Sequence, residues 1–532
     1  MRLAGGEKSR VGIYGWGLVA PRAGSIRDFE ALLRSHTSGL KTVTSPELGQ
    51  DLFAVGDPEF SIDTYADWIT ERHGASYFTR MKKKMGDNVG FTVGAAIQAL
   101  ECTPDLEQVV RDADDACHVY VGSGVGDLRE VHEATRTIDR ATRRWNHFWA
   151  SRDQCEARAA FETSGVVPEG APPPPAPSTL PEDSIERAEA AGVWDEYWAA
   201  HSNALRRFFE RFSAIEKLGP TSERSEDAHL DGIRRRAREE RALLAEVGCP
   251  QPPFSSVDAK LIWNIQNAPA AQLTMLLGIH GAAWAPVGAC STFGIALKCG
   301  RDAILRGEAK MAIIGTADPR PDAALIAAFH AARVMPGSGE VNSPFTSLRG
   351  THLSGGSCIW ILGDESHCAA RGLRPVGGWV EGIGLSSDAE HIITPSLSGP
   401  KRAIRRAFDE AHVRPDEIAL FDLHATGTPG DLNELALVQE FVSSKTRITA
   451  RKGQLGHGMA NSGGWELTAL AMGLAKSEAL GTSIDAAKVH PKMCARESLV
   501  CETSPITGSV GAKLMLGIGG IASCVVLRRD EP

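Results

Sequence analysis

Three residues in this chain have the side-chain types and surroundings of a reactive centre: one cysteine and two histidines, each within a glycine-rich segment. Cys290 lies in VGACSTFGIALKCG, His424 opens HATGTPGD, and His457 lies in KGQLGHGMANSGG. A thiol can accept an acyl group, and two imidazoles can handle the charge that develops on a second substrate. Carbon–carbon bond formation from acyl thioesters requires this combination of groups.

The sequence around Cys290 predicts an activated nucleophile at the start of a helix. Small residues precede Cys290, and a helix-forming run, FGIALKCGRDAIL, follows it. Free N–H groups and the dipole at a helix N-terminus favour a thiolate, in a strand–corner–helix arrangement similar to a nucleophile elbow. The alternative is a buried structural cysteine, a role that better suits four others: Cys102, Cys299, Cys358 and Cys524.

His424 follows an apolar run, IALFDL, which predicts a buried strand. Its imidazole is therefore expected at the carboxyl end of that strand, where the sheets of α/β proteins bind ligands. Thr426 and Thr428 follow at alternate positions, and their hydroxyls suit a thioester carbonyl or a pantetheine amide. The alternative is a plain turn whose threonines cap a helix that begins at Asp431 or at Pro429–Gly430.

His457 has a glycine on each side, and Lys452 lies five residues upstream. The lysine could orient the site or bind a carboxylate, although an isolated pair of this kind more commonly lies on the surface. Residues 516–523, LGIGGIAS, form a glycine-rich turn whose N–H groups could complete an oxyanion hole with the N–H of Cys290. A tight turn between two closing strands would explain that segment as well.

Strand-like and helix-like segments alternate along the chain, which predicts an α/β fold. Strands are expected at 10–19, 116–128 (ending in a glycine-rich corner), 310–318 and 357–365, and helices at 79–101 and 268–281. The C-terminal part repeats this layout: residues 374–387 resemble the opening strand, 418–427 resemble 116–128, and 513–529 predict a hairpin. Two similar α/β halves are therefore expected.

Residues 129–255 differ in character and predict a mainly helical insertion in the first half. They are rich in Arg, Glu and Ala, with a proline-rich break at 169–183. One amphipathic helix is expected from six residues at helical spacing: Trp194, Trp198, His201, Leu205, Phe208 and Phe212. A second helix is expected at 231–248, ending at Gly248. The insertion is either a structural cap or dimer flap, or a lid over a substrate channel. The expected domains are the first half in two parts (1–128 and 256–370), the insertion (129–255) and the second half (371–532).

Composition narrows the class of protein. A net charge of −9 argues against nonspecific nucleic-acid binding, which depends on neutralising phosphates. Eleven cysteines without CxxC spacing indicate reduced thiols rather than a disulfide scaffold or a zinc site. The first residues lack the apolar core of a signal peptide, and no apolar run approaches the roughly 20 residues of a membrane span. We therefore expect a cytoplasmic protein.

The three motifs together resemble those of the β-ketoacyl-acyl carrier protein synthases, condensing enzymes of the thiolase fold. GACSTFG resembles the active-site cysteine motif, HATGTPGDLNE the HGTGT-type histidine motif, and KGQLGHGMANSGG the lysine-plus-GH motif. Residues 80–86, 382–396 and 516–523 also align with family segments. The resemblance covers about 400 residues and implies a five-layered αβαβα sandwich of two duplicated halves, usually in an obligate homodimer.

The resemblance also implies roles for individual residues. Cys290 would accept the acyl group, while His424 and His457 would promote decarboxylation of a malonyl thioester and stabilise the enolate. Lys452 would support His457, and Glu434 would anchor the histidine loop. The other implied contacts are the oxyanion-hole N–H groups of Cys290 and Ile518, the substrate neighbours Thr426, Thr428, Phe293, Asn461 and Gly519, and a carrier-protein patch of Arg80, Lys82, Lys83 and Lys84.

No metal or organic cofactor is implied, because loss of carbon dioxide drives the condensation and phosphopantetheine arrives with the substrate. The expected partners are an acyl carrier protein or coenzyme A thioesters. Several departures from the family pattern indicate a specialised synthase of fatty-acid-like or polyketide metabolism: SLRGTHLSGGSC in place of DGF and GEGAG, a histidine motif shorter by one residue, Ile518 at the gate, Ile521–Ala522, and Asn461–Ser462.

Two alternatives keep the fold. One is an acyltransferase, cyclase or hydrolase that acts on a carrier-bound thioester without decarboxylation. The other is a non-catalytic partner such as a chain-length factor; these usually lose the cysteine, whereas this chain retains Cys290, His424, His457 and Lys452.

Overall fold

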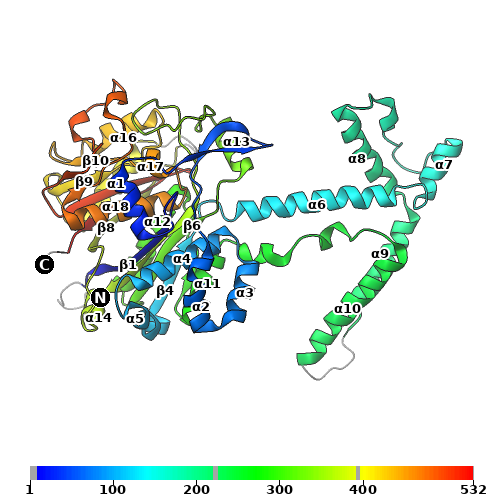
Figure 1. Cartoon of the computed structure of the whole chain (residues 1–532), viewed down its shortest axis with the longest axis horizontal. Coiled ribbons are helices and arrows are strands. Elements are labelled where there is room, and N and C mark those ends of the chain that lie inside the picture. Colours follow the sequence, from blue (N-terminus) through cyan, green and yellow to red (C-terminus); the bar gives the residue numbers. More distant parts are fainter. Residues whose placement is uncertain (1–8, 220–225, 391–395, 531–532) are drawn as a thin grey trace. The chain divides into compact units, whose positions relative to one another are not determined.

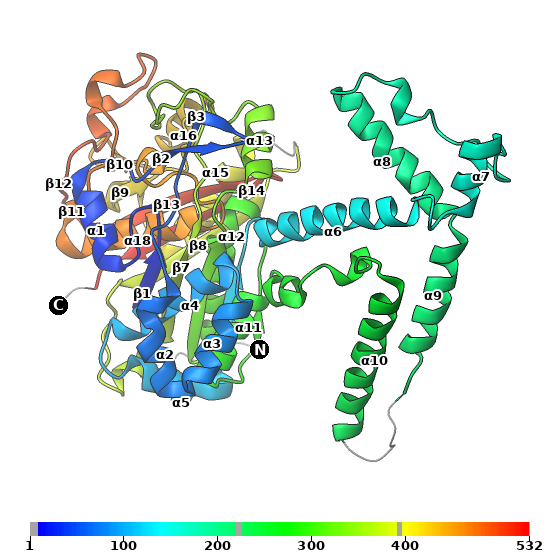
Figure 2. The same ribbon diagram turned by 45° about the vertical axis from the view of Figure 1, so that its right-hand side comes forward.

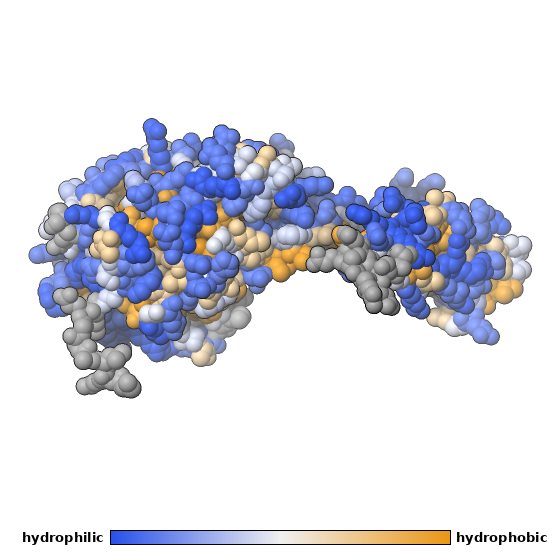
Figure 3. All heavy atoms as spheres, turned by 90° about the horizontal axis from the view of Figure 1, so that it is seen from below, coloured by the Kyte–Doolittle hydropathy of each residue, from blue (hydrophilic) through white to orange (hydrophobic). Residues whose placement is uncertain are grey.

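The computed structural model describes residues 9–219, 226–390 and 396–530. The chain forms two compact units, one made of residues 1–130 and 262–532 and the other of residues 131–261. The smaller unit corresponds to the predicted insertion at 129–255. On the face drawn in Figure 3 most surface residues are hydrophilic, with a few small hydrophobic areas. Within the described ranges, no helix combines the length and apolar character needed to cross a bilayer.

A ten-stranded sheet forms the centre of the larger unit (Figure 1). The N-terminal part of the unit supplies β1 (Val11–Val19), β4 (Cys117–Gly122), β5 (Ala283–Trp284), β6 (Met311–Asp318) and β7 (Gly356–Asp364). The C-terminal part supplies β8 (Trp379–Ser387), β9 (Ile418–Asp422), β10 (Arg447–Thr449), β13 (Val510–Gly517) and β14 (Ile521–Arg528). The strand order is β10-β9-β13-β14-β8-β1-β7-β6-β4-β5.

This order consists of two equivalent halves that meet at β1 and β8. From β1 outward the neighbours are β7, β6, β4 and β5, and from β8 outward they are β14, β13, β9 and β10. In each half the first two pairings are antiparallel and the next two are parallel. The halves pair at one position, Gly12 opposite Trp379. The predicted duplication is confirmed, including the closing hairpin of β13 and β14.

Helices complete the layers of a thiolase-like sandwich. Helix α4 (Asp87–Glu101) packs on β1 and β7 and against α11 (Ala268–Leu277), and α15 (Ser398–Ala411) packs on β8 and β14. Helices α12 (Thr292–Leu305) and α18 (Asn461–Lys476) contact each other and strands of both halves. Helix α18 is buried almost throughout, as its apolar sequence requires of a middle layer. With the two halves of the sheet as separate layers, the order is helix (α4 and α11), half-sheet, helix (α12 and α18), half-sheet, helix (α15), which confirms the expected fold.

Smaller elements surround these layers in the larger unit. They are α1 (Ile26–Ser35), β2 (Lys41–Ser45), β3 (Gly49–Val55), α2 (Ala66–His73), α3 (Ala75–Lys84), α5 (Leu106–Ala113), α13 (Ala323–Ala331), α14 (Glu365–Ala369), α16 (Gly430–Val438), α17 (Lys452–Leu455), β11 (Glu478–Ala479) and β12 (Ser504–Pro505).

The prediction of one helix over 79–101 is wrong, because α3 ends at Lys84 and α4 begins at Asp87. The backbone between them is extended at Met85, and Gly86 donates its N–H to the side chain of Asn264. A Cβ on Gly86 would lie 2.3 Å from a carboxylate oxygen of Asp127. Contacts with residues distant in sequence therefore break a segment whose local periodicity predicts a continuous helix.

The smaller unit is helical and has its own aromatic core. Its helices are α6 (Leu128–Trp149), α7 (Glu156–Ser164), α8 (Ile185–Ala200), α9 (Asn203–Glu216) and α10 (Glu226–Val247). Trp149 and Trp198 are fully buried in this core. The two interpretations of the insertion, as a cap or flap and as a lid, stay predictions.

The expectation of one amphipathic helix through residues 194–212 is wrong, since α8 and α9 are separate helices (Figure 2). Ser202 separates them. Its hydroxyl oxygen accepts the N–H of Leu205 at the start of α9 and donates to the carbonyl of Gln154 at 2.6 Å. The apolar residues on both sides still share one core, so the periodicity identifies the buried stripe correctly but not the break within it.

Candidate active site

Cys290 lies in a short 3-10 turn, Ala289–Ser291, directly before α12, so the predicted position at a helix N-terminus is confirmed. Its side chain is buried, with 3% of the residue exposed. The preceding Ala289 has a left-handed backbone with φ of 49°, as a sharp corner before a nucleophile requires.

The expectation of a ready thiolate at Cys290 is not met. Burial raises the pKa of the thiol to about 12; the Lys452 cation acts in the opposite direction but does not compensate. Backbone N–H groups of Ile518 and of Cys290 itself point to the sulfur and also favour its charged form. The thiol is therefore neutral at pH 7, and a negative charge on sulfur must develop during the reaction.

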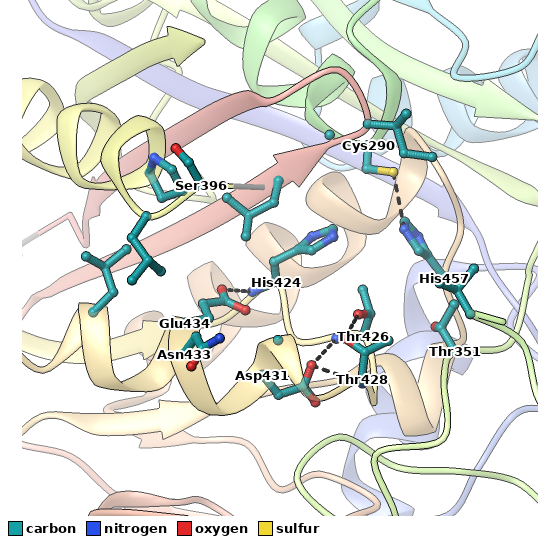
Figure 4. A pocket seen from close by; sticks show the side chains of 18 of the residues that line it. Cys290, Thr351, Ser396, His424, Thr426, Thr428, Asp431, Asn433, Glu434 and His457 are labelled. Atoms are coloured by element: carbon teal, nitrogen blue, oxygen red, sulfur yellow. Dashed lines mark hydrogen bonds between the residues drawn. The ribbon is translucent and has the colours of Figure 1, made fainter. Parts of the chain in front are cut away.

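His457 faces Cys290, with 3.2 Å between its Nε2 atom and the sulfur (Figure 4). The other ring nitrogen, Nδ1, accepts the backbone N–H of Met459 at 3.2 Å and lies 3.2 Å from the hydroxyl of Ser462. A neutral ring whose Nδ1 accepts a hydrogen bond carries its proton on Nε2, so an N–H donor points to the sulfur. Burial, followed by the cations of Lys452 and Lys513, holds the pKa of His457 well below its usual value.

The backbone around His457 is fixed by the segment that leads into β7. The N–H of His457 donates to the carbonyl of His352, and Leu353 forms an isolated parallel bridge with His457. Gly456 adopts φ of 70°, and a Cβ there would lie 1.9 Å from the hydroxyl oxygen of Ser354. Only glycine allows this close approach, which explains the glycine before His457.

His424 follows β9 and lies in the same pocket, with its ring centroid 5.4 Å from that of His457. The Glu434 carboxylate accepts the N–H of His424 at 2.6 Å and that of Ala425 at 2.8 Å, so it anchors this loop as the resemblance implies. Burial raises the pKa of Glu434 to about 7. Burial, the Lys452 cation and His457 hold the pKa of His424 well below its usual value, and its Nδ1 has no hydrogen-bond partner among the described residues.

The two predicted threonines line the same pocket. Their hydroxyl oxygens, Oγ1 of Thr426 and of Thr428, lie 3.1 Å apart. The loop that carries them is held by Asp431, whose carboxylate accepts the N–H groups of Thr426 at 2.8 Å and Gly427 at 3.0 Å. The alternative, a turn before a helix, is also partly right, because α16 begins at Gly430.

A buried network of charged side chains lies behind the two histidines. Lys452 donates to the carbonyl of His424 and pairs with Glu466 at 2.8 Å. Lys513 lies 2.7 Å from Glu466 and 2.9 Å from Asp422, which also has Arg451 at 3.5 Å. Burial alone would lower the pKa of Lys513, but the two carboxylates outweigh it and raise that pKa.

Sequence reasoning identified only Lys452 among these charges. The missed residues are Asp422, Arg451, Glu466 and Lys513. Their signal was available: each charged residue stands inside or beside an apolar run, in ALFDLH, ITARKG, GWELTALAM and GAKLMLG, where an exposed side chain is not expected.

Other implied contacts fall outside the pocket. Phe293 is a core residue packed against Trp360, with ring centroids 5.2 Å apart. Asn461 is fully buried and donates to the carbonyl of Gly356 at 2.9 Å, while its neighbour Ser462 is the residue that reaches His457. Gly519 does not line the pocket, whereas Gly517 and Ile518 do. Phe293, Asn461 and Gly519 are therefore absent from the lining of the pocket, and their predicted contact with a substrate stays a prediction.

The four basic residues of the implied carrier-protein patch are exposed along α3. Lys82 pairs with Asp63 at 2.6 Å, and the Lys84 ammonium lies 4.0 Å from the ring centroid of Trp263. Arg80 and Lys84 line a pocket of about 200 Å³ that is distinct from the one containing Cys290.

The pocket that contains Cys290, His424 and His457 has a volume of about 290 Å³. Its apolar wall includes Phe329, Val334, Leu397, Leu437 and Leu516. Ser396, at the end of the family-like segment 382–396, also lines it; residues 391–395 of that segment lie outside the described residues. A buried thiol, two neutral imidazoles, free N–H donors and an apolar wall suit acyl transfer followed by stabilisation of an enolate.

Comparison with known proteins agrees with this site. Residues 241–366 match "Beta-ketoacyl synthase, N-terminal domain" and residues 378–482 match "Beta-ketoacyl synthase, C-terminal domain". Among curated relatives, Nodulation protein E of Rhizobium leguminosarum bv. trifolii is 28% identical over 216 residues, which are 40% of this chain and 53% of that protein. The 3-oxoacyl-[acyl-carrier-protein] synthase 2 of Staphylococcus aureus (strain COL) is 26% identical over 277 residues, which are 50% of this chain and 66% of the relative.

The fold has close counterparts among solved structures. The ishigamide ketosynthase/chain length factor superposes with a TM-score of 0.68 and 18% identity, covering 98% of this chain and 100% of that one. The sequence matches to the two curated relatives thus span between half and two thirds of their length, whereas the structural match covers nearly the whole chain.

Proposed function

Because the chain belongs to the β-ketoacyl synthase family, we propose that it catalyses a decarboxylative Claisen condensation between an acyl group on Cys290 and a malonyl thioester. The observation that carries the proposal is the meeting of the Cys290 sulfur, His457 and His424 in one pocket. Members of this family are acyltransferases. The acyl group, of fatty-acid or polyketide type, is identified by the experiment below.

In the first step the Cys290 sulfur attacks the carbonyl carbon of the incoming thioester. The N–H groups of Cys290 and Ile518 are placed to stabilise the oxyanion that forms. The carbon–sulfur bond to pantetheine then breaks, and the departing pantetheine sulfur takes up the proton that Cys290 gives up. The Nε2–H of His457, 3.2 Å from the sulfur, stabilises negative charge on it, which a thiol with a pKa of about 12 needs.

In the second step a malonyl thioester occupies the pocket beside the two imidazoles. The bond between its α-carbon and its carboxylate breaks, carbon dioxide leaves, and the electron pair forms an enolate whose oxygen accepts hydrogen bonds from His424 and His457. Both rings are neutral because of their lowered pKa values. A neutral ring donates a hydrogen bond without readily giving up its proton, so the α-carbon stays nucleophilic.

In the third step the α-carbon attacks the carbonyl of acyl-Cys290. The new carbon–carbon bond replaces the carbon–sulfur bond, and the product leaves as a β-ketoacyl thioester. The Cys290 thiolate then takes up a proton from solvent, which balances the negative charge of the carboxylate lost as carbon dioxide. This sequence needs no metal or organic cofactor from the protein; we propose that phosphopantetheine arrives on the substrate.

The partners are part of the proposal. An acyl carrier protein or a coenzyme A thioester would deliver the acyl groups, and the name of the Staphylococcus aureus relative supports the former. A homodimer is supported by the exposed edge strand β5, where Trp284 is 47% exposed, and by Met275 of the nearby α11, which is 52% exposed. A cytoplasmic location stays a prediction from the cysteine pattern.

The alternatives differ in products. An acyltransferase, cyclase or hydrolase would use Cys290 but release no carbon dioxide, and no feature of the pocket favours it. A chain-length factor, as in the ishigamide ketosynthase/chain length factor, would form no acyl adduct. The intact thiol and imidazole arrangement supports a catalytic chain over this last alternative.

Intact-mass spectrometry tests the proposal. The protein is incubated with acyl donors, washed, and then given malonyl-pantetheine, while carbon dioxide and β-keto products are measured. We expect an acyl adduct that Cys290→Ala abolishes and that Cys299→Ala, a change to a half-buried cysteine of the helix that follows Cys290, leaves intact. An adduct with no carbon dioxide release would refute condensation and favour the acyltransferase alternative.

A further inference from the structure

The pocket wall contains a hydroxyl that the proposed mechanism does not use, that of Thr351. The residue is only 4% exposed, yet it lines the pocket that contains Cys290 and both histidines. Its Oγ1 atom is buried and has no hydrogen-bond partner among the described residues. A buried hydroxyl without a partner is costly, so this one is expected to find its partner in the occupant of the pocket.

The backbone on both sides of Thr351 is tied to the catalytic loops. The N–H of Gly350 donates to the carbonyl of Gly427, between Thr426 and Thr428, at 2.8 Å. On the other side, the carbonyl of His352 accepts the N–H of His457. Thr351 is therefore held between the threonine loop and the second histidine, and Figure 4 shows it beside His457 and near the two threonines.

Two other hydroxyl pairs of the wall are hydrogen-bonded within the protein, whereas Nδ1 of His424 has no partner among the described residues. The hydroxyls of Thr426 and Thr428 lie 3.1 Å apart and bond each other, and Ser396 pairs with the hydroxyl of Ser398 at 2.9 Å. Within the described part of the lining there is no lysine or arginine. Lys452 is directed instead to the carbonyl of His424 and to Glu466.

These observations bear on how a carboxylate would be held. A malonyl carboxylate that enters this pocket loses water and needs a hydrogen-bond donor. A paired cation would stabilise the carboxylate strongly and oppose loss of carbon dioxide, because that stabilisation disappears when the charge moves to the enolate. A single neutral hydroxyl orients the group while stabilising it less.

We propose that Thr351 is a specificity-determining residue whose hydroxyl donates a hydrogen bond to the carboxylate of the malonyl thioester. The inference rests on the proposed function and names the group that selects its second substrate. The carboxylate is held so that the carbon–carbon bond breaks with its electron pair passing into the enolate beside His424 and His457. Carbon dioxide then leaves, and the Thr351 hydroxyl keeps its own proton throughout.

The test compares Thr351→Val, which removes the hydroxyl at nearly constant shape, with Thr351→Ser, which retains it. Acylation of Cys290 by acyl-pantetheines is measured separately from carbon dioxide release and condensation with malonyl-pantetheine. For Thr351→Val we expect acylation within about twofold of the wild type and a fall of roughly ten- to hundredfold in kcat/KM for malonyl-pantetheine, the usual effect of losing a hydrogen bond to a charged group. Thr351→Ser should stay within about threefold of the wild type.

A binding measurement adds a readout that a merely structural role would not change. Two unreactive amide analogues of the thioester are compared as inhibitors, one ending in a sulfonate and one in a methyl group. The wild type should prefer the sulfonate, and Thr351→Val should lose that preference.

The outcomes separate the inference from the function on which it rests. A wild type that takes up acyl groups but releases no carbon dioxide refutes the proposed function. A wild type that condenses, with Thr351→Val equally active or equally selective between the two analogues, overturns the assignment of Thr351 alone. Equal losses of acylation and condensation in Thr351→Val would also overturn it, since they indicate a structural defect.

Discussion

Replacing Lys513 with methionine tests whether the buried charges behind the histidines act as one network. Lys513 is fully buried, lies 2.9 Å from Asp422 and 2.7 Å from Glu466, and donates to the carbonyl of Leu423 at 2.9 Å. Methionine fills similar volume without a charge, so the variant removes these three interactions with little change in packing.

The expected loss of stability follows from the charges that stay behind. Removing one partner of a buried ion pair costs about 3–5 kcal/mol, because the other is left uncompensated. Here Lys452, Lys513 and Arg451 face Asp422 and Glu466, and after the change each carboxylate still has one cation, at 3.5 Å and 2.8 Å respectively. The loss should therefore lie at the lower end, about 3 kcal/mol.

Urea denaturation of the full chain measures this loss, with the transition that coincides with loss of Cys290 acylation assigned to the larger unit. Lys298→Met is the matched control, because Lys298 makes a half-exposed pair with Asp302 on α12 and should change the free energy of unfolding by less than about 0.5 kcal/mol. A loss below about 1 kcal/mol for Lys513→Met would refute the network argument.

The same variant has a predicted effect on pH dependence. The Lys513 cation contributes to the low pKa values of His424 and His457. Without it both pKa values rise, so the rings become protonated at a higher pH than before and the acid limb of kcat/KM moves upward. An acid limb that stays in place, while the Lys298 control also leaves it unchanged, would contradict this role.

Three further changes test features of the fold. Burial raises the pKa of Asp127 from an ordinary 3.8 to about 7, so folding becomes less favourable as the pH rises through this range. Asp127→Asn removes the buried charge. By urea denaturation, the variant should therefore be more stable than the wild type by up to about 4 kcal/mol at pH 8 and equally stable below pH 3.8. Ser202→Ala should cost about 1 kcal/mol of helix stability, seen as faster hydrogen exchange in α9. Gly456→Ala should abolish condensation, since its Cβ would meet Ser354, whereas Gly372→Ala, with φ of 73° and open space around it, should lose only about 1 kcal/mol.

Much of the fold is predictable from the sequence because its strands carry strong local signals. The apolar runs that become β6 and β7 are buried from end to end, β1 is buried at all positions but Trp16, and the repeated layout correctly predicts the duplication. The two wrong helix predictions have tertiary causes. Gly86 is fixed by Asn264 and Asp127, and Ser202 by Gln154, all distant in sequence, so no local periodicity contains them.

The active-site residues also divide into those that the sequence predicts and those that it does not. Cys290, His424, His457 and Lys452 are identified by their glycine-rich surroundings and by the family resemblance, and the structure brings all four together. Lys513 and Thr351 were missed because one sits in a strand and the other in an irregular segment, and only their packing gives them a role. The thiolate prediction left out burial, which raises the pKa of the Cys290 thiol although the Lys452 cation and backbone N–H groups act in the opposite direction.

The reactive centre is built from residues of both halves of the larger unit. The sulfur belongs to the N-terminal half, through α12, and both imidazoles belong to the C-terminal half, through the loop after β9 and the loop before α18. Neither half alone contains a nucleophile with its charge-stabilising partners. Since the strands of the two halves are paired at a single position, a small slide of one half against the other would change the sulfur–nitrogen spacing. The spacing of the reactive groups therefore depends on how the two halves are aligned as much as on any single side chain.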